Sequence, residues 1–472
     1  MLLLLPSLTV AAAQPSMKNI LERMRLAGGN VYEAHIASTS VPEPSGGIAE
    51  DDMQGTRFLT RRCISDLCEG SYFDGRRWYS VSLNATALPR MPESDPSERA
   101  LRSDLSLDFL NRRFTAAGGR IRDGGASSFE GKPCRRIVVS QPSMVPTQLC
   151  VDTRSWLLTA IRDSDGNILA LRDYRRVGRY RLPFEVYRNG ALLRRYDSRT
   201  VVEAPLDSPQ GLAGAFPTAI ARASLDPHSA TPIANCRIGD RDERCLIDSG
   251  NSGLAMSIEL AEALGLQAVG AFRVSGLGTY ATEVVRAGPL QMGTLQLPPA
   301  NYVVLADIHR YGYDLVLGAD LLAASKVTID PFEHAITFAP SSPGDDADSV
   351  ALAFENLVPV IGVTLDDIRA RLAIDTGDQS NINLSWRFYA DHPSLFRPQR
   401  TEPVAGVGGG STQLIGRIES MRIGQYTALN QEIGTTQNLL GTGDGHLGAA
   451  FLSRFTIVLD YPQQRMRLLP AK

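Results

Sequence analysis

The sequence carries little net charge and no long apolar run beyond its first residues. Its 48 Lys and Arg nearly balance its 51 Asp and Glu, which leaves a formal net charge of −3. A nearly neutral chain has no overall field that would attract nucleic acid, and after the N-terminal segment no stretch is apolar enough to span a bilayer. The six His are scattered and no Cys-x-x-Cys occurs. We therefore expect no metal, no cofactor, no nucleic-acid partner and no transmembrane span.

The N-terminal segment is short, apolar and without Lys or Arg before its leucine run. A leucine run followed by Ala11-x-Ala13 predicts a secretory signal peptide over residues 1–13. Since a basic start is missing, the alternative is a buried N-terminal strand or helix. No Cys follows the predicted cleavage position, so we expect no lipid anchor. The signal predicts a periplasmic or secreted protein.

The cysteines fit export. An even number behind a signal peptide indicates disulfide bonds, and we expect nearest neighbours to pair because each pair brackets a turn-like stretch. Spacing alone does not fix the connectivity, and the alternative is six reduced, buried thiols. The disulfide candidates are Cys63, Cys68, Cys134, Cys150, Cys236 and Cys245.

A length of 472 residues, 43% of them hydrophobic, suits two or three globular domains. Residues 17–205 form a β-rich region whose clearest strands are expected at 135–139, 149–152 and 186–188. Turn signals divide this region into antiparallel hairpins: Asp74-Gly75, Asp123-Gly124 and Asn189-Gly190. Changes in composition predict linkers at 206–215 and 341–350.

One motif occurs twice and organises the rest of the chain. An apolar run, Asp, a small hydroxyl residue and Gly follow one another at 245–250 and again at 371–377. The apolar run predicts a buried strand, and the Gly permits a tight turn. Asp248 and Asp375 are 127 residues apart (375 − 248). Each carboxylate is thus expected at the end of a core strand; the alternative is two Asp that only cap turns.

The segments around the two motifs match as well. The paired segments are Pro232-Ile233 with Pro359-Val360, Gly276-Leu277-Gly278 with Gly406-Val407-Gly408, and residues 314–319 with 444–449. A short helix is predicted over 257–264, with Ser257 as N-cap and Gly265 as stop, and a shorter one from Ser385. The register defines an internal repeat of residues 216–340 and 351–472.

Each repeat resembles a retropepsin-type aspartic protease unit, with its order of hairpin, Asp-Ser/Thr-Gly, glycine-bearing flap, apolar-apolar-Gly, short helix and last strand. Retroviral enzymes pair two identical chains, whereas two copies in one chain are similar to bacterial aspartyl-protease-family proteins with tandem units. The resemblance extends from about Phe216 to the C-terminus. It implies a mainly β fold with two retropepsin-like β-barrel lobes, paired within one chain about a pseudo-two-fold axis.

The resemblance also implies an exported aspartic endopeptidase that acts on a peptide or protein substrate without a cofactor. Two carboxylates sharing one proton would activate a water and protonate the scissile carbonyl. The catalytic residues would be Asp248 and Asp375. Their supporting residues would be Ser249, Gly250, Thr376 and Gly377. The flap and substrate-binding residues would be Gly276, Leu277, Gly278, Gly406, Val407 and Gly408; the alternative for them is an ordinary hairpin turn.

The region before the repeats is similar, more loosely, to the half-barrel of bacterial periplasmic lipoprotein carriers. The residues that carry this likeness are Tyr72-Phe73-Asp74-Gly75-x-x-Trp78, Asp173-Tyr174-Arg175 and Leu182-Pro183. An antiparallel β half-barrel is expected there; the alternative is a plain β domain without a ligand. Nine Arg between 172 and 199 indicate either a solvated strand face or a surface for anionic lipid or polymer.

Three residues depart from the retropepsin pattern. Asn251 and Asp378 stand where a small residue usually follows the Gly, and His446 replaces an apolar residue in the second repeat. Asp378 either faces the dyad, where its charge would raise the carboxyl pKa values, or caps a turn. His446 is expected to be a neutral core residue. These departures leave a second functional class open, a non-catalytic envelope binding protein for peptide, lipid or polymer.

Overall fold

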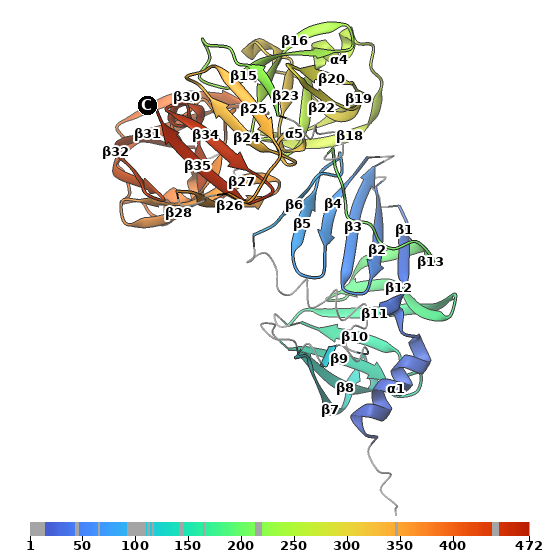
Figure 1. Ribbon diagram of the computed structural model, residues 1–472. Coiled ribbons are helices and arrows are strands. Elements are labelled where there is room, and N and C mark those ends of the chain that lie inside the picture. The colour runs from blue at the N-terminus through green and yellow to red at the C-terminus, as the bar shows by residue number, and fades with distance from the viewer. Residues whose placement is uncertain are drawn as a thin grey trace, which may run out of the picture. The chain divides into compact units, whose positions relative to one another are not determined.

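The computed structural model is mainly β, as predicted (Figure 1). It describes residues 15–42, 47–64, 67–91, 110, 114–115, 118–140, 146–163, 166–212, 220–344, 348–436 and 443–471. The predicted signal peptide and parts of both predicted linkers lie outside these residues. The chain divides into two compact units: Met1–Pro42, Ala49–Phe58 and Asp95–Leu206 form the first, and Glu43–Ile48, Leu59–Ser94 and Asp207–Lys472 form the second. The division differs from the predicted domains, because residues 59–94 belong to the same unit as the two repeats, whereas they were expected within the β-rich region 17–205.

The first unit is an antiparallel sheet with one longer helix, α1 (Met17–Gly28). Ser16 caps the helix by accepting a hydrogen bond from the Asn19 amide. Ile20 and Met24, four residues apart, bury one helix face. In sheet order the strands are β2 (Ile48–Gln54), β1 (His35–Ser40), β13 (Ala191–Val202), β12 (Tyr180–Arg188), β11 (Ile168–Val177), β10 (Leu158–Arg162), β9 (Thr147–Asp152), β8 (Lys132–Ser140) and β7 (Arg120–Phe129).

The strands predicted at 135–139, 149–152 and 186–188 are confirmed, because they fall inside β8, β9 and β12. Asn189-Gly190 forms the turn between β12 and β13. The prediction for Asp123-Gly124 was wrong. These residues lie inside β7 at a bulge, where the Asp123 carboxylate accepts hydrogen bonds from the Gly125 amide and the Arg135 Nε, both at 2.8 Å. The Asp side chain therefore stabilises an irregular strand instead of closing a hairpin.

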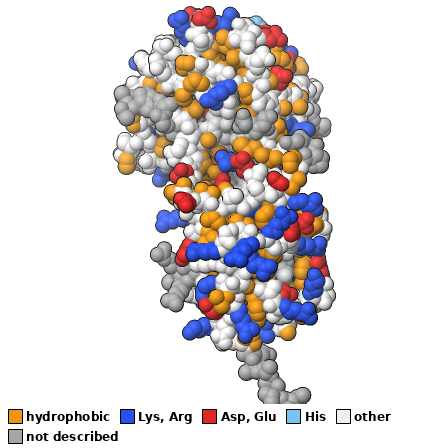
Figure 2. All heavy atoms as spheres, turned by 90° about the vertical axis from the view of Figure 1, so that its right-hand side faces the viewer, with side chains coloured by type: hydrophobic (Ala, Val, Ile, Leu, Met, Phe, Trp, Pro, Cys, Tyr) orange, Lys and Arg blue, Asp and Glu red, His pale blue; other side chains and the backbone are white. Residues whose placement is uncertain are grey.

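Basic side chains gather on the face of the first unit that Figure 2 draws, some of them beside acidic ones. Several of the predicted basic residues are paired. Arg172 contacts Glu130, Arg175 contacts Asp173, and Arg195 contacts Glu185. Arg199 differs, because it is largely buried and burial lowers its pKa. These pairs favour the interpretation of a solvated strand face for part of the segment.

The second unit begins with a small antiparallel meander. Its strands in sheet order are β6 (Ala87–Pro89), β5 (Trp78–Val81), β4 (Leu67–Phe73) and β3 (Arg57–Ile64). The Asp74-Gly75 turn joins β4 to β5, as predicted. The turn between β5 and β6 is anchored on the first repeat, because the Ser82 hydroxyl and the Asn84 side-chain amide donate to the Asp320 carboxylate at 2.6 and 2.7 Å.

The first repeat forms a nine-stranded sheet. In sheet order its strands are β18 (Ala268–Ser275), β19 (Thr279–Ala287), β22 (Ala300–Leu305), β17 (Leu254–Ser257), β23 (Leu315–Leu317), β16 (Arg241–Ile247), β15 (Ile233–Ile238), β20 (Leu290–Met292) and β21 (Leu295–Leu297). The helices are α4 (Ile258–Ala263) and α5 (Ala319–Leu322). Ser257 caps α4, as predicted, by accepting from the Leu260 amide.

The second repeat repeats this plan. Its strands in sheet order are β27 (Val358–Leu365), β28 (Ile368–Ile374), β33 (Gly445–Leu447), β29 (Ile382–Ser385), β32 (Tyr426–Thr436), β31 (Gly409–Ile423) and β30 (Arg400–Gly406). Its helices are α6 (Trp386–Asp391) and α7 (Ala449–Leu452). The helix after Ser385 was predicted to be shorter than its counterpart, but α4 and α6 both span six residues. Tyr389 packs against the aromatic ring of Phe396 beyond the helix end, which helps to hold the last turn.

The two repeats are joined by strand pairing between β24 (Lys326–Asp330) and β34 (Phe455–Asp460). A six-stranded segment runs β14 (Ala221–Ser224), β25 (Ala335–Ala339), β24, β34, β35 (Arg465–Pro470) and β26 (Val350–Glu355). Equivalent strands of the two repeats stand at equal distances from the centre of this segment, where β24 and β34 pair in antiparallel register. One apolar core continues beneath both repeats and buries Leu321, Phe338, Phe354 and Phe451. The repeats thus share a sheet and a core.

Three disulfides join the predicted nearest neighbours: Cys63 with Cys68, Cys134 with Cys150, and Cys236 with Cys245. The third links β15 to β16, the strand that leads to Asp248. Among the described residues, no helix has the length and apolar character needed to cross a membrane.

Candidate functional site

The two aspartates stand at the ends of equivalent buried strands. In the first repeat β23 lies between β16 and β17, parallel to the former and antiparallel to the latter. In the second repeat β33 lies in the same way between β28 and β29. The Asp248 amide donates to the Leu317 carbonyl and the Asp375 amide to the Leu447 carbonyl, each at 3.0 Å. The chain therefore leaves each core strand at a fixed point, with the aspartate first in the turn.

The structure brings the two turns together, so that each aspartate lies against the glycine of the other repeat. A Cβ atom added to Gly250 would lie 2.4 Å from the Asp375 Cγ, and one added to Gly377 would lie 2.5 Å from the Asp248 Cγ. Only glycine leaves room for the opposite carboxyl group. At this separation each carboxyl group changes the pKa of the other.

The hydroxyl residues next to the aspartates hold the turns to each other. The Ser249 amide donates to the Thr376 Oγ1 at 3.0 Å, and the Thr376 amide donates to the Ser249 Oγ at 3.2 Å. Each hydroxyl then donates across the pair, Ser249 to the Ile374 carbonyl and Thr376 to the Ile247 carbonyl. Both side chains are buried, so these four bonds form away from competing water.

The glycines that follow orient the carboxylates. The Gly250 amide donates to the Asp248 Oδ1 at 2.8 Å, and the Gly377 amide donates to the Asp375 Oδ1 at 3.1 Å. The second repeat adds one more donor, because the Asp378 amide reaches the same Asp375 oxygen at 2.9 Å. All six predicted dyad and support residues therefore lie in one cluster.

Both aspartates hold their protons more tightly than isolated carboxyl groups do. Burial raises the pKa of Asp248 well above its ordinary value, and the charge of Asp375 raises it further. Burial also raises the pKa of Asp375, but the nearby His446 opposes that rise. Two carboxyl groups this close cannot both ionise cheaply, so one of them keeps a proton over a wide pH range.

His446 was predicted to be a neutral core residue, and its surroundings differ from that expectation. Its Nδ1 lies 3.3 Å from the Asp375 Oδ2 and 3.8 Å from the Asp378 Oδ2. Burial would lower the pKa of His446, but the two carboxylates outweigh it and raise that pKa. Burial would likewise raise the pKa of Asp378, yet the contact with His446 and the hydrogen bonds from Ser380 lower it. An imidazolium beside two carboxylates is therefore favoured.

Asp378 fulfils both roles considered for it. Its side chain accepts hydrogen bonds from the Ser380 amide and hydroxyl, each at 2.8 Å, and so caps the turn. Its charge also acts on the dyad, because it contributes to raising the pKa of Asp375. The equivalent position of the first repeat is Asn251, which is neutral.

The ligand atoms of Asp375, Asp378 and His446 lie within 4.8 Å of one another, a spacing that could hold a cation. Each of these groups already has protein partners. Asp375 accepts from two backbone amides, Asp378 accepts from Ser380, and His446 contacts both carboxylates. Because the three groups contact one another and other donors of the protein, we assign no metal here.

The two predicted flaps meet at their tips. The first is the turn between β18 and β19, and the second is the turn between β30 and β31. The Leu277 amide donates to the Val407 carbonyl at 2.9 Å. A Cβ atom on Gly278 would lie only 2.1 Å from the Gly408 carbonyl oxygen, and one on Gly276 would lie 2.6 Å from that of Val407. The flap glycines thus permit close contact between the two backbones.

The surfaces beside the dyad differ between the repeats. In the first repeat Ile233, Leu246, Ala255, Leu305, Ile308 and Val316 form a buried apolar cluster, and the flap residues Val274, Tyr280 and Val407 pack on it. Among the described residues, the cluster of the second repeat that contains the equivalent positions consists of Val358, Val360 and Ala373. The buried apolar cluster is therefore larger in the first repeat than in the second.

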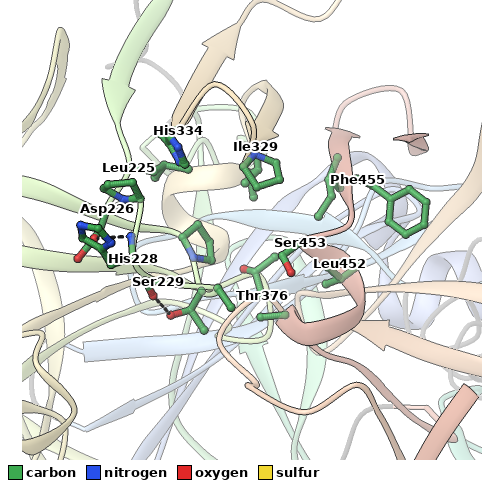
Figure 3. Close-up of a pocket in the computed structure, with 17 residues that line it drawn as sticks. Leu225, Asp226, His228, Ser229, Ile329, His334, Thr376, Leu452, Ser453 and Phe455 are labelled. Carbon is green, nitrogen blue, oxygen red and sulfur yellow. Dashed lines mark hydrogen bonds between the residues drawn. The ribbon is translucent and has the colours of Figure 1, made fainter. Parts of the chain in front are cut away.

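A separate cavity of about 290 Å³ lies at the junction of the repeats. Figure 3 draws its lining, in which Leu225, Ile329, Leu452 and Phe455 are apolar and Thr376 connects it to the paired turns. Its polar groups satisfy one another locally: Asp226 accepts from the His228 amide, and Ser229 bonds to Thr231. Neither Asp248 nor Asp375 lines it, so it is distinct from the dyad.

Two further residues near the site were not predicted. Tyr313 packs on the apolar cluster, and its pKa is raised first by burial and then by the charges of Asp248 and Asp375. Asp320, in α5, is 2% exposed and binds the turn between β5 and β6. Neither residue belongs to a predicted motif, although Asp320 lies two residues after the apolar-apolar-Gly segment of the first repeat, which ends at Gly318.

Comparisons with known proteins give likenesses to solved structures, but none to a family model or a curated sequence. A solved structure described as a retropepsin-like aspartic protease from Rickettsia conorii matches at 17% identity with a TM-score of 0.20. The match covers 25% of this chain and 94% of that protein.

Proposed function

We propose that this chain is an exported aspartic endopeptidase whose catalytic residues are Asp248 and Asp375. The observation that carries the proposal is the reciprocal packing of each carboxyl group against the glycine of the other repeat. That packing needs two matched turns and creates a pair of carboxyl groups with raised pKa values. Perturbed, paired carboxyl groups at the ends of rigid strands are suited to general acid–base chemistry. The three disulfides support export.

In the proposed reaction, one carboxylate takes a proton from a water molecule while the water oxygen attacks the scissile carbonyl carbon. The other carboxyl group gives its proton to the carbonyl oxygen, so the intermediate is a neutral gem-diol. The protonated base then gives its proton to the amide nitrogen as the C–N bond breaks, while a gem-diol hydroxyl returns its proton to the other carboxylate, so the dyad again holds one shared proton. The Ser249 and Thr376 bonds would keep both turns still during these transfers.

The substrate in this proposal is an extended peptide between the dyad and the flaps. An extended chain would bind mainly through its backbone, as a strand does. The apolar cluster around Leu246 and Val316 favours a hydrophobic side chain on one side of the scissile bond. The pair of Asp378 and His446 favours a polar or basic side chain on the other side.

The test is cleavage of a mixed peptide pool, read by mass spectrometry from acidic to neutral pH. The protein would lack residues 1–13 and keep its disulfides. Asp248→Asn and Asp375→Asn are the test variants, and Asp307→Asn, a half-exposed aspartate paired with Arg310, is the matched control. Loss of cleavage in both test variants but not in the control would support the proposal. Cleavage that survives both, or none at any pH, would refute it and favour a binding protein.

A further inference from the structure

We propose that His446, held as a cation between Asp375 and Asp378, makes the two dyad aspartates unequal. In this assignment Asp375 is the carboxylate that accepts the proton from water, and Asp248 is the acid that protonates the carbonyl oxygen. The inference deepens the proposed function and rests on it for the catalytic roles. The electrostatic part, that Asp375 ionises before Asp248, concerns the protein alone and is testable without a substrate.

The geometry around His446 is one-sided. Its Nδ1 lies 3.3 Å from the Asp375 Oδ2, whereas Asp248 has no contact of this kind among the described residues. The imidazole is 14% exposed and Asp375 is 16% exposed, so water screens their attraction only weakly. A positive charge at this distance stabilises the ionised form of the nearer carboxyl group more than that of the farther one.

Backbone donors add to the difference. The Asp375 Oδ1 accepts hydrogen bonds from the Gly377 and Asp378 amides, whereas the Asp248 Oδ1 accepts one from the Gly250 amide. Hydrogen bonds to the ionised form favour it. Asp375 therefore has an additional amide and a nearby imidazole that Asp248 lacks among the described residues, and both favour the ionised form of Asp375.

The first repeat provides an internal reference. Val316 occupies the position of His446, Asn251 that of Asp378, and Leu246 that of Ala373. Within the strands, Leu246 is the partner of Val316, and Ala373 is the partner of His446. The smaller Ala373 leaves room for the imidazole ring, so three positions differ together. The charged pair thus replaces an apolar contact on one side of the dyad only.

The remaining groups near the pair do not cancel this effect. On β29 the strand partner of His446 is Asn383, which is neutral. Burial raises the pKa of Tyr313 and of Tyr461, and the charge of Asp248 raises both pKa values further, so both hydroxyl groups stay neutral. Asp378 is the opposing charge, because it raises the pKa of Asp375. Since His446 lies closer to Asp375 than to Asp378, its charge is not neutralised at the dyad.

The experiment is a pH titration of the full chain with its disulfides intact, in the presence of a chelator. Carboxyl carbons of Asp and ring nuclei of His would be followed by NMR, with Asp248→Asn and Asp375→Asn used to assign the dyad signals. The test variants are His446→Val and Asp378→Asn, which install the residues of the first repeat, and their double variant. His446→Gln keeps a polar side chain of similar size if the valine variant does not fold.

The expected result is that Asp375 loses its proton at lower pH than Asp248 in the unaltered protein. In His446→Val, Asp375 should ionise at higher pH; in Asp378→Asn it should ionise at lower pH; the double variant should lie between them. On peptide substrate, kcat/KM of His446→Val should fall on the order of tenfold at the acidic limb of the profile and less at higher pH.

The outcomes separate the two proposals. If Asp248 ionises first, or if His446→Val leaves the order and the acidic limb unchanged, the inference about His446 is overturned. If the titration order is as expected but no variant cleaves any peptide, the electrostatic assignment stands and the proposed peptidase function fails. A purely structural role for His446 would lower stability in both His446 variants without moving the Asp375 titration.

Discussion

Ser249 and Thr376 bind each other reciprocally, each through its amide to the hydroxyl of the other. The Thr376 hydroxyl also donates to the Ile247 carbonyl at 2.8 Å. We predict that Thr376→Val, which keeps the side-chain shape, will destabilise the protein by roughly 1–3 kcal/mol for each buried partner left unpaired. Chemical denaturation would measure this loss. Thr427→Val, at an exposed position of β32, is the matched control, and an equal loss in both variants would contradict the prediction.

The contact between the flap tips predicts a specific effect on substrate binding. Gly278→Ala places a methyl group where the Gly408 carbonyl oxygen lies 2.1 Å away, so the flap backbones must separate. We expect kcat/KM on a cleaved peptide to fall on the order of tenfold to a hundredfold, with little change in stability because the tip is not part of the core. Gly362→Ala, which meets no atom within 4 Å, should have no such effect; equal losses would argue against closing flaps.

The buried Asp320 links the turn between β5 and β6 to the first repeat. Asp320→Ala leaves the Ser82 hydroxyl and the Asn84 amide without their acceptor, so we expect a loss of roughly 1–3 kcal/mol per unpaired donor. The burial of Asp320 raises its pKa, although hydrogen bonds oppose this. Thermal unfolding and limited proteolysis near Ser82 would measure the effect. Unchanged proteolysis would mean that this turn is held by other contacts.

Stability should depend on pH through the pair of Asp378 and His446. The pKa of Asp378 is lowered, so the stability it contributes is present above its unfolded pKa and is lost as pH falls through the folded value. The pKa of His446 is raised, so its contribution is present below its unfolded pKa and is lost as pH rises through the folded value. Both contributions are complete between about pH 4 and 6.5.

The measurement is the free energy of unfolding of the unaltered protein minus that of the Asp378→Asn/His446→Val double variant, determined inside this pH window and on both sides of it. The difference should be largest inside the window and should shrink below and above it. Asp173→Asn/Arg175→Val, which removes an exposed pair in β11, should give a difference that is small and nearly flat. A flat difference for the buried pair would contradict the assignment of charges.

Much of the fold followed from local patterns. The run Cys245-Leu246-Ile247 is buried throughout, and such a run predicts a core strand whichever partners it finds. Ser257 caps α4 because Ser accepts from the amide three residues on, a purely local bond. The resemblance of each repeat to a retropepsin unit implied that the two Asp turns lie together, and in the structure each aspartate lies against the glycine of the other turn. The mainly β class and the disulfide pairs followed in the same way.

What could not be predicted depends on contacts between distant residues. Asn84 and Asp320 are 236 positions apart, and neither stands in a motif that indicates a partner. His446 was expected to be neutral because it stands where the motif usually has an apolar residue, whereas its contacts with Asp375 and Asp378 raise its pKa. Asp123-Gly124 has the composition of a hairpin turn, but Arg135 on the next strand binds its carboxylate inside β7.

The pairing of β24 with β34 joins the two repeats in one sheet of a single chain. In an assembly of two identical subunits, every substitution is made on both sides of the symmetry axis at once. A histidine beside one aspartate would then stand beside the other as well, and the two effects would cancel. Here each half of the centre is encoded separately, so a single change in the gene can alter one half alone. Because the two halves are joined in one chain, a single substitution can make the surroundings of the two aspartates chemically different.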